Sequence, residues 1–299
     1  MRVCQGLESR SHRNSEVKVN RGCKGRKYMT PEALDFEAEC EQIHALLKQQ
    51  NTSIFKRRTQ FKNWTVGEII GHLHLWNIAA NLSLTDPDGF SDFITNAMQQ
   101  LSAGDSHAAF QATYFEGQSD AKIFEAWAAY YSLMAHRFHT ADPDRRVKWA
   151  GPDMSVRACI IARQMEHWAH AQAIFDLMGI ERINADRVKN VVHIGVTTFS
   201  WSFRVRGKTP PSPKPYIKLI APSGEIWTWN DEQTDNRIEG LAAEFSQVVT
   251  QCRHLEDTSL ITTGEIAAEW MAHAQCFAGG PETPPSPGTR FKAAKVLID

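Results

Sequence analysis

Two side chains that could bind a metal ion, Glu166 and His170, lie four residues apart. They fall within residues 155–179, SVRACIIARQMEHWAHAQAIFDLMG, which have the length and periodicity of one amphipathic helix. On a helix, residues i and i+4 lie one above the other on the same face. A carboxylate and an imidazole placed in this way supply two of the three protein ligands that a catalytic zinc-type site uses. The spacing therefore indicates a metal site that needs one more ligand from elsewhere.

The third ligand that we predict is His72, on a second helix that spans residues 61–84. The apolar stripe of this helix has the spacing of a face packed in a core: Ile69, Leu73, Trp76 and Ala80. His72 lies at the edge of that stripe and is expected to point inward. His74 is expected to point outward, because residues i and i+2 do not share a helix face.

Other interpretations of these histidines stay open. A lone histidine beside a tryptophan is more often a packed core residue, and a glutamate and histidine at i and i+4 are often a surface pair. His136 and His139 are competing ligands near the end of a predicted helix, where a histidine also suits the helix dipole. His167 adjoins Glu166 but is rotated by about 100° around the helix axis. We rank these three histidines below His72.

The elements that must position the site are four helices, expected at residues 31–50, 61–84, 120–139 and 155–179. Their predicted starts carry N-capping residues: Thr30, Thr65 with Glu68 in a capping box, and Ser119. No convincing strand precedes about residue 190. We therefore expect residues 29–180 to form an antiparallel four-helix bundle, with the metal held between facing helices.

The chain of 299 residues is long enough for a second domain. Residues 1–28 hold eight lysines and arginines against two acids and are predicted to be a disordered basic extension. Residues 180–190 indicate a polar linker, and residues 188–279 a smaller α+β domain. Residues 280–299 are predicted to be a disordered tail, because the segment from residue 279 on begins with the proline-rich stretch GGPETPPSPG.

The expected elements of the α+β domain follow from β-branched and aromatic runs and from one helical stripe. They are a strand at 191–205, a hairpin of 216–221 and 225–229, a helix at 237–253, a strand at 258–263 and a helix at 264–278. Arg204 and Arg206 could bind a carboxylate, but solvated charges on a strand are the preferred interpretation of both.

The composition is that of an ordinary globular protein, with 42% hydrophobic and 22% charged residues. The net charge of −1 gives no general attraction to nucleic acid or to anionic membranes. No apolar run is long enough to span a membrane, so no membrane partner is expected. The six cysteines form no CxxC pair, which favours free thiols and a cytoplasmic location.

Two segments resemble a known family. The motifs WTVGEIIGHLHLW and MEHWAHAQ resemble the DinB-like metal-binding bundle of the mycothiol-dependent maleylpyruvate isomerases. In that family, a histidine from an early helix and a Glu-xxx-His pair hold a divalent metal, which implies the roles of His72, Glu166 and His170 here. The segments HIGVTTFSWSFRVRG and IKLIAPSGEIWTWN resemble a companion C-terminal domain that is sometimes labelled wyosine base formation.

The resemblance implies a thiol-dependent transferase or isomerase. Its cofactor is a divalent metal, for which zinc suits the mixed N/O donors, and its partners are a low-molecular-weight thiol and an electrophilic substrate. One alternative is a metal- or thiol-binding module without turnover, because no general base is obvious beside the three ligands. A second is an RNA-linked role, suggested by the wyosine label and by the basic stretch 204–218. The sequence lacks an iron–sulfur CxxxCxxC motif, and no nucleic-acid partner is expected.

Overall fold

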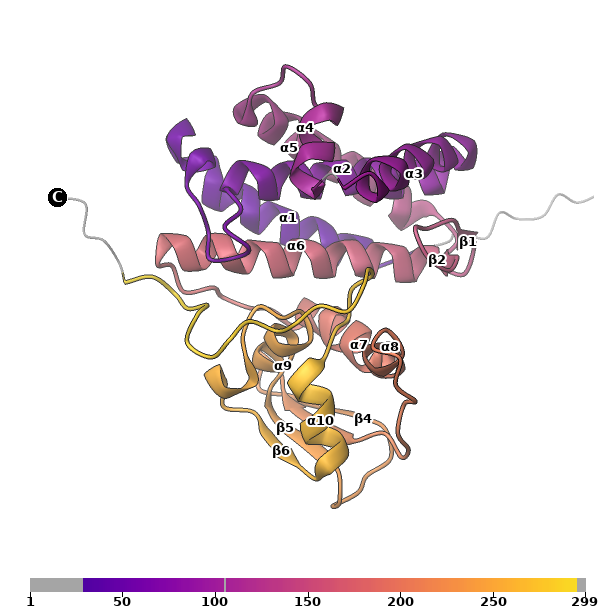
Figure 1. Ribbon diagram of the computed structural model, residues 1–299, viewed down its shortest axis with the longest axis vertical. Helices are drawn as coiled ribbons and strands as arrows, with labels where there is room; N and C mark the ends of the chain where they lie inside the picture. Colours follow the sequence, from indigo (N-terminus) through magenta and orange to yellow (C-terminus); the bar gives the residue numbers. More distant parts are fainter. Residues whose placement is uncertain (1–28, 105, 295–299) are drawn as a thin grey trace, which may run out of the picture.

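Two parts of unequal size make up the molecule, a layer of long helices and a smaller part that contains a sheet (Figure 1). The computed structural model describes residues 29–104 and 106–294. The architecture confirms the predicted fold class, an all-α N-terminal part followed by a smaller α+β part. The predicted basic extension, residues 1–28, lies outside the described residues.

Four long helices pack around the larger core: α1 (Glu32–Leu47), α2 (Val66–Thr85), α5 (Asp120–Thr140) and α6 (Val156–Met178). Four apolar residues of α1 recur at helical spacing and are buried in this core: Phe36, Cys40, Ile43 and Leu47. The elements between the four helices are the 3-10 helix η1 (Thr52–Lys56), α3 (Pro87–Ser102), α4 (His107–Tyr114), β1 (Arg146–Val147) and β2 (Met154–Ser155).

The directions of the bundle helices correct the prediction that all neighbours are antiparallel. Arg137 donates to Asn81 near the C-terminal ends of α5 and α2, so these two helices run parallel. Glu32 pairs with Arg157 at the N-terminal ends of α1 and α6, which also run parallel. The reason is the excursion through α3 and α4, which returns the chain to the start of α2 before α5 begins.

Two of the three predicted N-caps are confirmed. The Thr65 side chain accepts from the Glu68 N–H at 3.1 Å, and Glu68 accepts from the Thr65 N–H at 2.6 Å. Ser119 caps α5. The prediction for Thr30 is wrong, because its hydroxyl donates to the carbonyl of Ala141 and ties α1 to the end of α5 instead.

Thr65→Ala is expected to lower the free energy of unfolding by about 1 kcal/mol, because the first turn of α2 loses its cap. Urea denaturation followed by circular dichroism measures the change. The matched control is Thr95→Ala, an exposed threonine inside α3, where a change of no more than about 0.5 kcal/mol is expected. Equal stability of the two variants would show that the capping box contributes nothing.

The smaller part contains a four-stranded sheet in the order β4-β3-β5-β6, in which β3 and β5 are parallel and the other pairs antiparallel. Its strands are β3 (Tyr216–Ile220), β4 (Ile226–Trp229), β5 (Arg237–Leu241) and β6 (Ile261–Thr263). Its helices are η2 (Asp186–Val188), α7 (Lys189–Thr197), α8 (Phe199–Arg204), α9 (Ala242–Val249), η3 (Leu255–Asp257) and α10 (Glu265–His273).

The predicted hairpin is confirmed as β3 and β4, but two other predictions for this part are wrong. Residues 191–205, expected to be a strand, form α7 and α8. Their buried residues recur at helical spacing: Val191, Val192, Val196, Phe199 and Phe203. Packing of this stripe against α6 and α9 therefore overrides the β propensity of the residues. The predicted helix at 237–253 is divided, because residues 237–241 join the sheet as β5.

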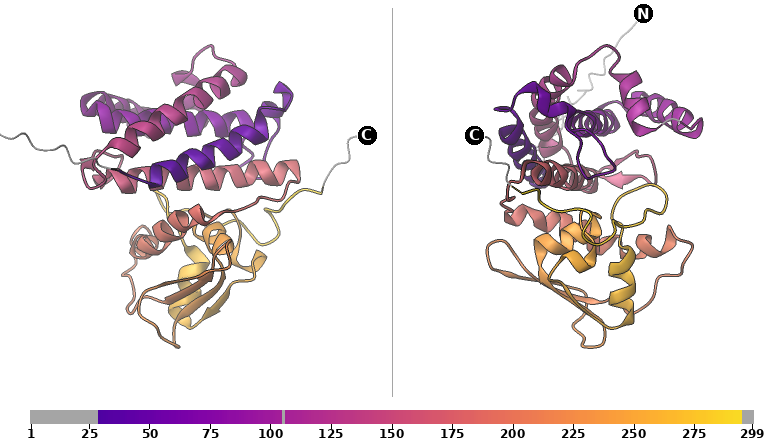
Figure 2. Two further views of the ribbon diagram at one scale, coloured as in Figure 1. Left: turned by 180° about the vertical axis from the view of Figure 1, so that it is seen from behind. Right: turned by 60° about the vertical axis from the view of Figure 1, so that its left-hand side comes forward.

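The prediction of a disordered tail at residues 280–299 falls partly outside the described residues, which end at 294, and residues 280–294 make specific contacts that the prediction did not include. Residues 279–294 contain no helix or strand, yet they cross between the two parts of the molecule (yellow in Figures 1 and 2). Lys62 pairs with Glu282 at 2.9 Å, and the Ala293 N–H donates to the carbonyl of Asp176 at 2.8 Å. Arg206 donates to the carbonyl of Glu282 and so holds the segment rather than facing solvent. These polar contacts hold in place a segment whose proline-rich composition is typical of disordered chains.

Helix α6 belongs to both cores. One side of it packs in the bundle, while Met165 and Trp168 are members of the second core, together with residues of α7, α9 and the sheet. The metal-site candidates on α6 are therefore fixed from two sides. Within the described part of the chain, none of the helices has the length and hydropathy required to cross a membrane.

Candidate metal centre

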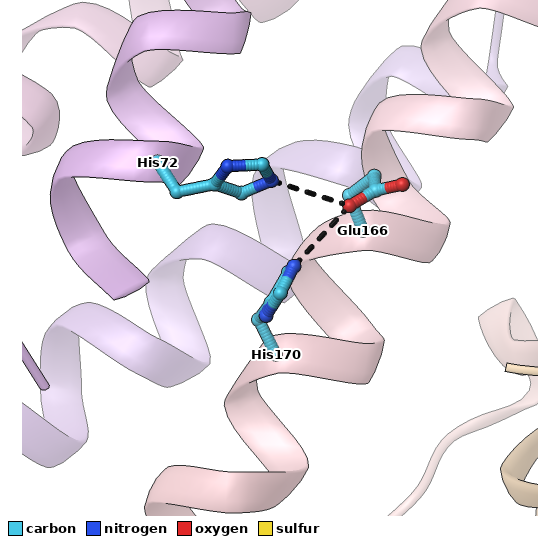
Figure 3. A group of neighbouring side chains, drawn as sticks. All are labelled: His72, Glu166 and His170. Atoms are coloured by element: carbon cyan, nitrogen blue, oxygen red, sulfur yellow. Dashed lines mark ion pairs between the residues drawn. The ribbon is translucent and has the colours of Figure 1, made fainter. Parts of the chain in front are cut away.

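His72 on α2 and the pair Glu166 and His170 on α6 point toward one another (Figure 3). Nε2 of His170 lies 3.3 Å from Oε2 of Glu166, and Nε2 of His72 lies 3.6 Å from the same oxygen. The ligand atoms of the three residues all lie within 4.8 Å of one another. The fold thus brings His72 to the helical pair across the contact between α2 and α6.

The spacing of these atoms suits a tetrahedral ligand set. With ligands about 2.1 Å from a zinc ion, neighbouring corners of the tetrahedron lie about 3.4 Å apart. The distances of 3.3 and 3.6 Å lie on either side of that value. Two imidazole nitrogens and one carboxylate oxygen leave one corner for another ligand. These residues could therefore hold a divalent metal ion with one position open.

The protonation of the group also suits metal binding. Burial lowers the pKa of His72 to about 4, against the opposing effect of its hydrogen bond with Glu166. Burial alone would raise the pKa of Glu166, but hydrogen bonds with His170 and His72 hold it well below its usual value. At neutral pH, His72 is therefore neutral and Glu166 ionised, which are the states that metal ligands require.

Aromatic side chains fix the orientation of the two imidazoles. The ring of Trp64 stacks on His170 at a centroid distance of 5.9 Å and an angle of 3°, and Phe61 meets the same histidine edge-on at 4.8 Å. Trp64 also contacts His72 at 5.4 Å. Both aromatic residues precede α2, so the segment that leads into this helix forms one wall of the site. Packing holds the ligands in place before any ion binds.

The prediction that His74 points outward is wrong. It is buried and stacks on Phe115 at 5.4 Å, and burial lowers its pKa to about 4. The physical reason is that α2 is covered on nearly every side, because α3 and α4 pack on the face that the bundle leaves free. His74 contacts Phe115 at the end of α4 and Tyr130 of α5, and it lies outside the group that could bind metal.

The other histidines are also outside the group, in agreement with their lower rank. His167 is fully buried and has core partners on both ring nitrogens. Its Nε2 accepts from the indole N–H of Trp127 at 3.3 Å, which leaves Nδ1 to donate to the carbonyl of Arg163 at 2.7 Å. His136 is exposed, and the ring of His139 contacts the carbonyl of Thr30 at the end of α5.

The sequence did not identify three residues near the centre. Trp64 and Phe61 lie outside the periodic part of α2, so no spacing related them to the histidines. His107, at the start of α4, has its ring centroid 6.2 Å from that of His72. The weak pattern of residues 90–118 gave no signal for it, although Ser106 caps the helix that it begins.

Comparison with known proteins gives three findings. Residues 36–175 match the family model described as the mycothiol maleylpyruvate isomerase N-terminal domain, a range that contains all three candidate ligands. Uncharacterized proteins of two strains of Mycobacterium tuberculosis are 31% identical over 251 residues, covering 84% of this chain and 96% of each relative. Crystal structures of the mycothiol-dependent maleylpyruvate isomerase and of a mutant are 12% identical, with a TM-score of 0.46 over 73% of this chain and 86% of theirs.

Proposed function

Since this chain belongs to the mycothiol maleylpyruvate isomerase N-terminal domain family, we propose that it is a metal-dependent enzyme that uses a low-molecular-weight thiol. The observation that carries the proposal is the convergence of His72, Glu166 and His170 within 4.8 Å. The reaction class is transfer of the thiol to an electrophilic carbon, or isomerisation of a double bond through addition of the thiol.

In this proposal, His72, Glu166 and His170 hold a divalent metal, for which zinc is the best match to two nitrogens and one oxygen. A bound divalent cation lowers the pKa of a thiol, so that thiolate is available at neutral pH. Glu166 would be the one anionic ligand, so a divalent ion held there would keep a net positive charge, which would favour binding of an anionic sulfur. Phe61 and Trp64 exclude water from one side of the two imidazoles.

The thiolate sulfur would form a bond to one carbon of an electron-poor double bond in the second substrate, while the π electron pair moves to the neighbouring carbon. If the carbon–sulfur bond is kept and the neighbouring carbon takes a proton from solvent, a transfer product results. Rotation about what is now a single bond, followed by expulsion of the same thiolate as the double bond re-forms, gives an isomer and regenerates the thiolate. Both outcomes use the same nucleophile, so the residues of the centre support the class of reaction and leave the electrophile open.

Thiol binding is expected to depend on the three ligands. Metal-free protein reconstituted with Co²⁺ should develop sulfur-to-cobalt charge-transfer absorption on addition of mycothiol, cysteine or glutathione, because thiolate is a good ligand of such ions. Serine, the oxygen analogue of cysteine, should give no such band. Absorption spectroscopy during the titration measures the effect. The exposed-site variant His136→Ala keeps all three ligands, so it should show the same band as the unmodified chain.

A Co²⁺-loaded protein that shows no spectral change with any of the three thiols would sink the thiol proposal and leave the metal site standing. If thiols bind and a screen of electrophiles gives no turnover, the chain is a binding module rather than an enzyme. Turnover that needs both the ion and the thiol supports the proposed reaction class.

A further inference from the structure

A cavity of about 460 Å³ lies where the helical layer meets the smaller part of the molecule, and it is separate from the metal centre. It is lined by the start of α1, by the first two turns of α6 and of α7, and by the edge strand β4, which lies below α6 in Figure 1. Its volume is in the range of about 300–1,000 Å³ that is usual for small-molecule sites, and interfaces between domains are common places for them.

The cavity and the metal centre lie on different faces of α6. Ile161 lines the cavity and Glu166 belongs to the metal centre. Five residues on a helix correspond to a rotation of about 140°. Arg157, also in the cavity, and His170 are thirteen residues apart, or about 20 Å along the helix axis. None of the residues that line the cavity is a candidate metal ligand.

Positive charge dominates the polar part of the lining. Arg157 and Lys189 contribute two cations, against the single carboxylate of Glu32. Glu32 Oε1 lies 3.3 Å from Nε of Arg157, so this carboxylate offsets part of the positive charge of the lining, and the side chain of Arg157 is about half exposed. Lys189 Nζ lies over the ring of Trp227 at 4.9 Å and has no ion-pair partner among the residues that the structure describes. The N-terminal ends of α6 and α7 add the positive ends of two helix dipoles.

Two tryptophans form the flat part of the lining. Trp227 and Trp229 project from the same face of β4, with ring centroids 6.4 Å apart and planes at 89°. Perpendicular indole rings make a corner against which a planar or cyclic molecule can stack with one face and one edge. Both tryptophans line the cavity: Trp227 is buried, and Trp229 is half-buried.

We propose that this cavity binds an anionic ring compound of low molecular weight, with its ring against Trp229 and its anionic group on Arg157 and Lys189. The site is independent of the metal, and the inference does not rest on the proposed thiol chemistry. A cationic compound is disfavoured, because two side-chain cations outnumber the single carboxylate of the lining. A neutral ring compound leaves both of these charges without a partner, so its affinity is lower.

Isothermal titration calorimetry of the full chain with four probes tests the proposal. Benzoate and phenyl phosphate are the anionic ring compounds, benzyl alcohol is the neutral ring, and inorganic phosphate is the anion without a ring. At least one anionic ring compound should bind, about tenfold or more tightly than benzyl alcohol and than inorganic phosphate. A preference between benzoate and phenyl phosphate shows which anionic group the cavity accepts.

The double variant Arg157→Gln, Lys189→Gln should weaken binding of the anionic ring compound by about tenfold or more. Trp229→Leu should weaken it as well, and should leave inorganic phosphate unchanged. Lys218→Gln, an exposed lysine on β3 outside the cavity, is the matched control and should bind like the unmodified chain. Binding should persist in His72→Ala, which separates this site from the metal centre.

Three results would overturn the inference. They are no binding of either anionic ring compound, equal affinity for benzyl alcohol, and unchanged affinity in the double variant. Loss of binding in His72→Ala, with the fold intact by circular dichroism, would assign the ligand to the metal centre instead.

Discussion

His72→Ala is expected to abolish metal binding, whereas the unmodified chain should purify with about one divalent ion. The ligand atoms of His72, Glu166 and His170 converge from two helices, so removal of one imidazole leaves only two protein ligands on α6. Loss of a group that merely supports a ligand costs about 10–100-fold in affinity, and loss of a ligand itself should cost more. Inductively coupled plasma mass spectrometry after dialysis against a weak chelator measures the metal content.

Two variants make this result specific. His136→Ala removes an exposed histidine of α5 that lies outside the group and should keep the full metal content. Glu166→Gln keeps the size of the side chain but removes its charge, and should lose the ion as His72→Ala does. The assignment of the site is falsified if His72→Ala retains a full equivalent of metal while its circular dichroism spectrum matches that of the unmodified chain.

The candidate site could be predicted because its geometry is largely local. Glu166 and His170 lie on one face of a helix by virtue of their spacing alone, and the rise per residue of the helix fixes their distance. His72 required one tertiary assumption, that the apolar stripes of α2 and α6 face each other. The structure packs α2 against α6 and brings the ligand atoms of the three residues within 4.8 Å of one another. One member of the predicted stripe, Trp76, packs against Phe93 of α3 instead.

The errors arose where tertiary packing outweighs local pattern. His74 was expected to face solvent because only one face of α2 was considered, and helices α3 and α4 cover the opposite face. The run 191–205 has β-branched residues at helical spacing, and burial between α6 and α9 decides its conformation. For residues 279–294, composition predicts disorder, but partners more than 100 residues away along the chain order the segment. Such partners leave no trace in a local window.

The second prediction with a large expected effect concerns residues 180–190, for which the sequence indicates a polar linker. Arg182, within residues 180–190, is buried and contacts Oε1 of the buried Glu39 on α1, while Arg187 donates to Oε2 of the same carboxylate at 2.8 Å. Arg182 also donates to the carbonyl of Trp168 at 2.5 Å. Glu39→Ala should lower the free energy of unfolding by about 3–5 kcal/mol, because a buried guanidinium loses its counter-charge. Urea denaturation measures this change.

The control and a rescue variant separate the cost of the unpaired charge from the value of the pair. Glu41→Ala removes an exposed acid of the same helix and should change stability by no more than about 0.5 kcal/mol. Replacing both buried partners, Glu39→Leu with Arg182→Leu, should recover much of the loss, since the guanidinium that remains, that of Arg187, is partly exposed and can be hydrated. A cost below about 1 kcal/mol for Glu39→Ala would mean that Arg182 finds another partner or water. In that case the contact between α1 and the segment before α7 would not hold the two parts of the molecule together.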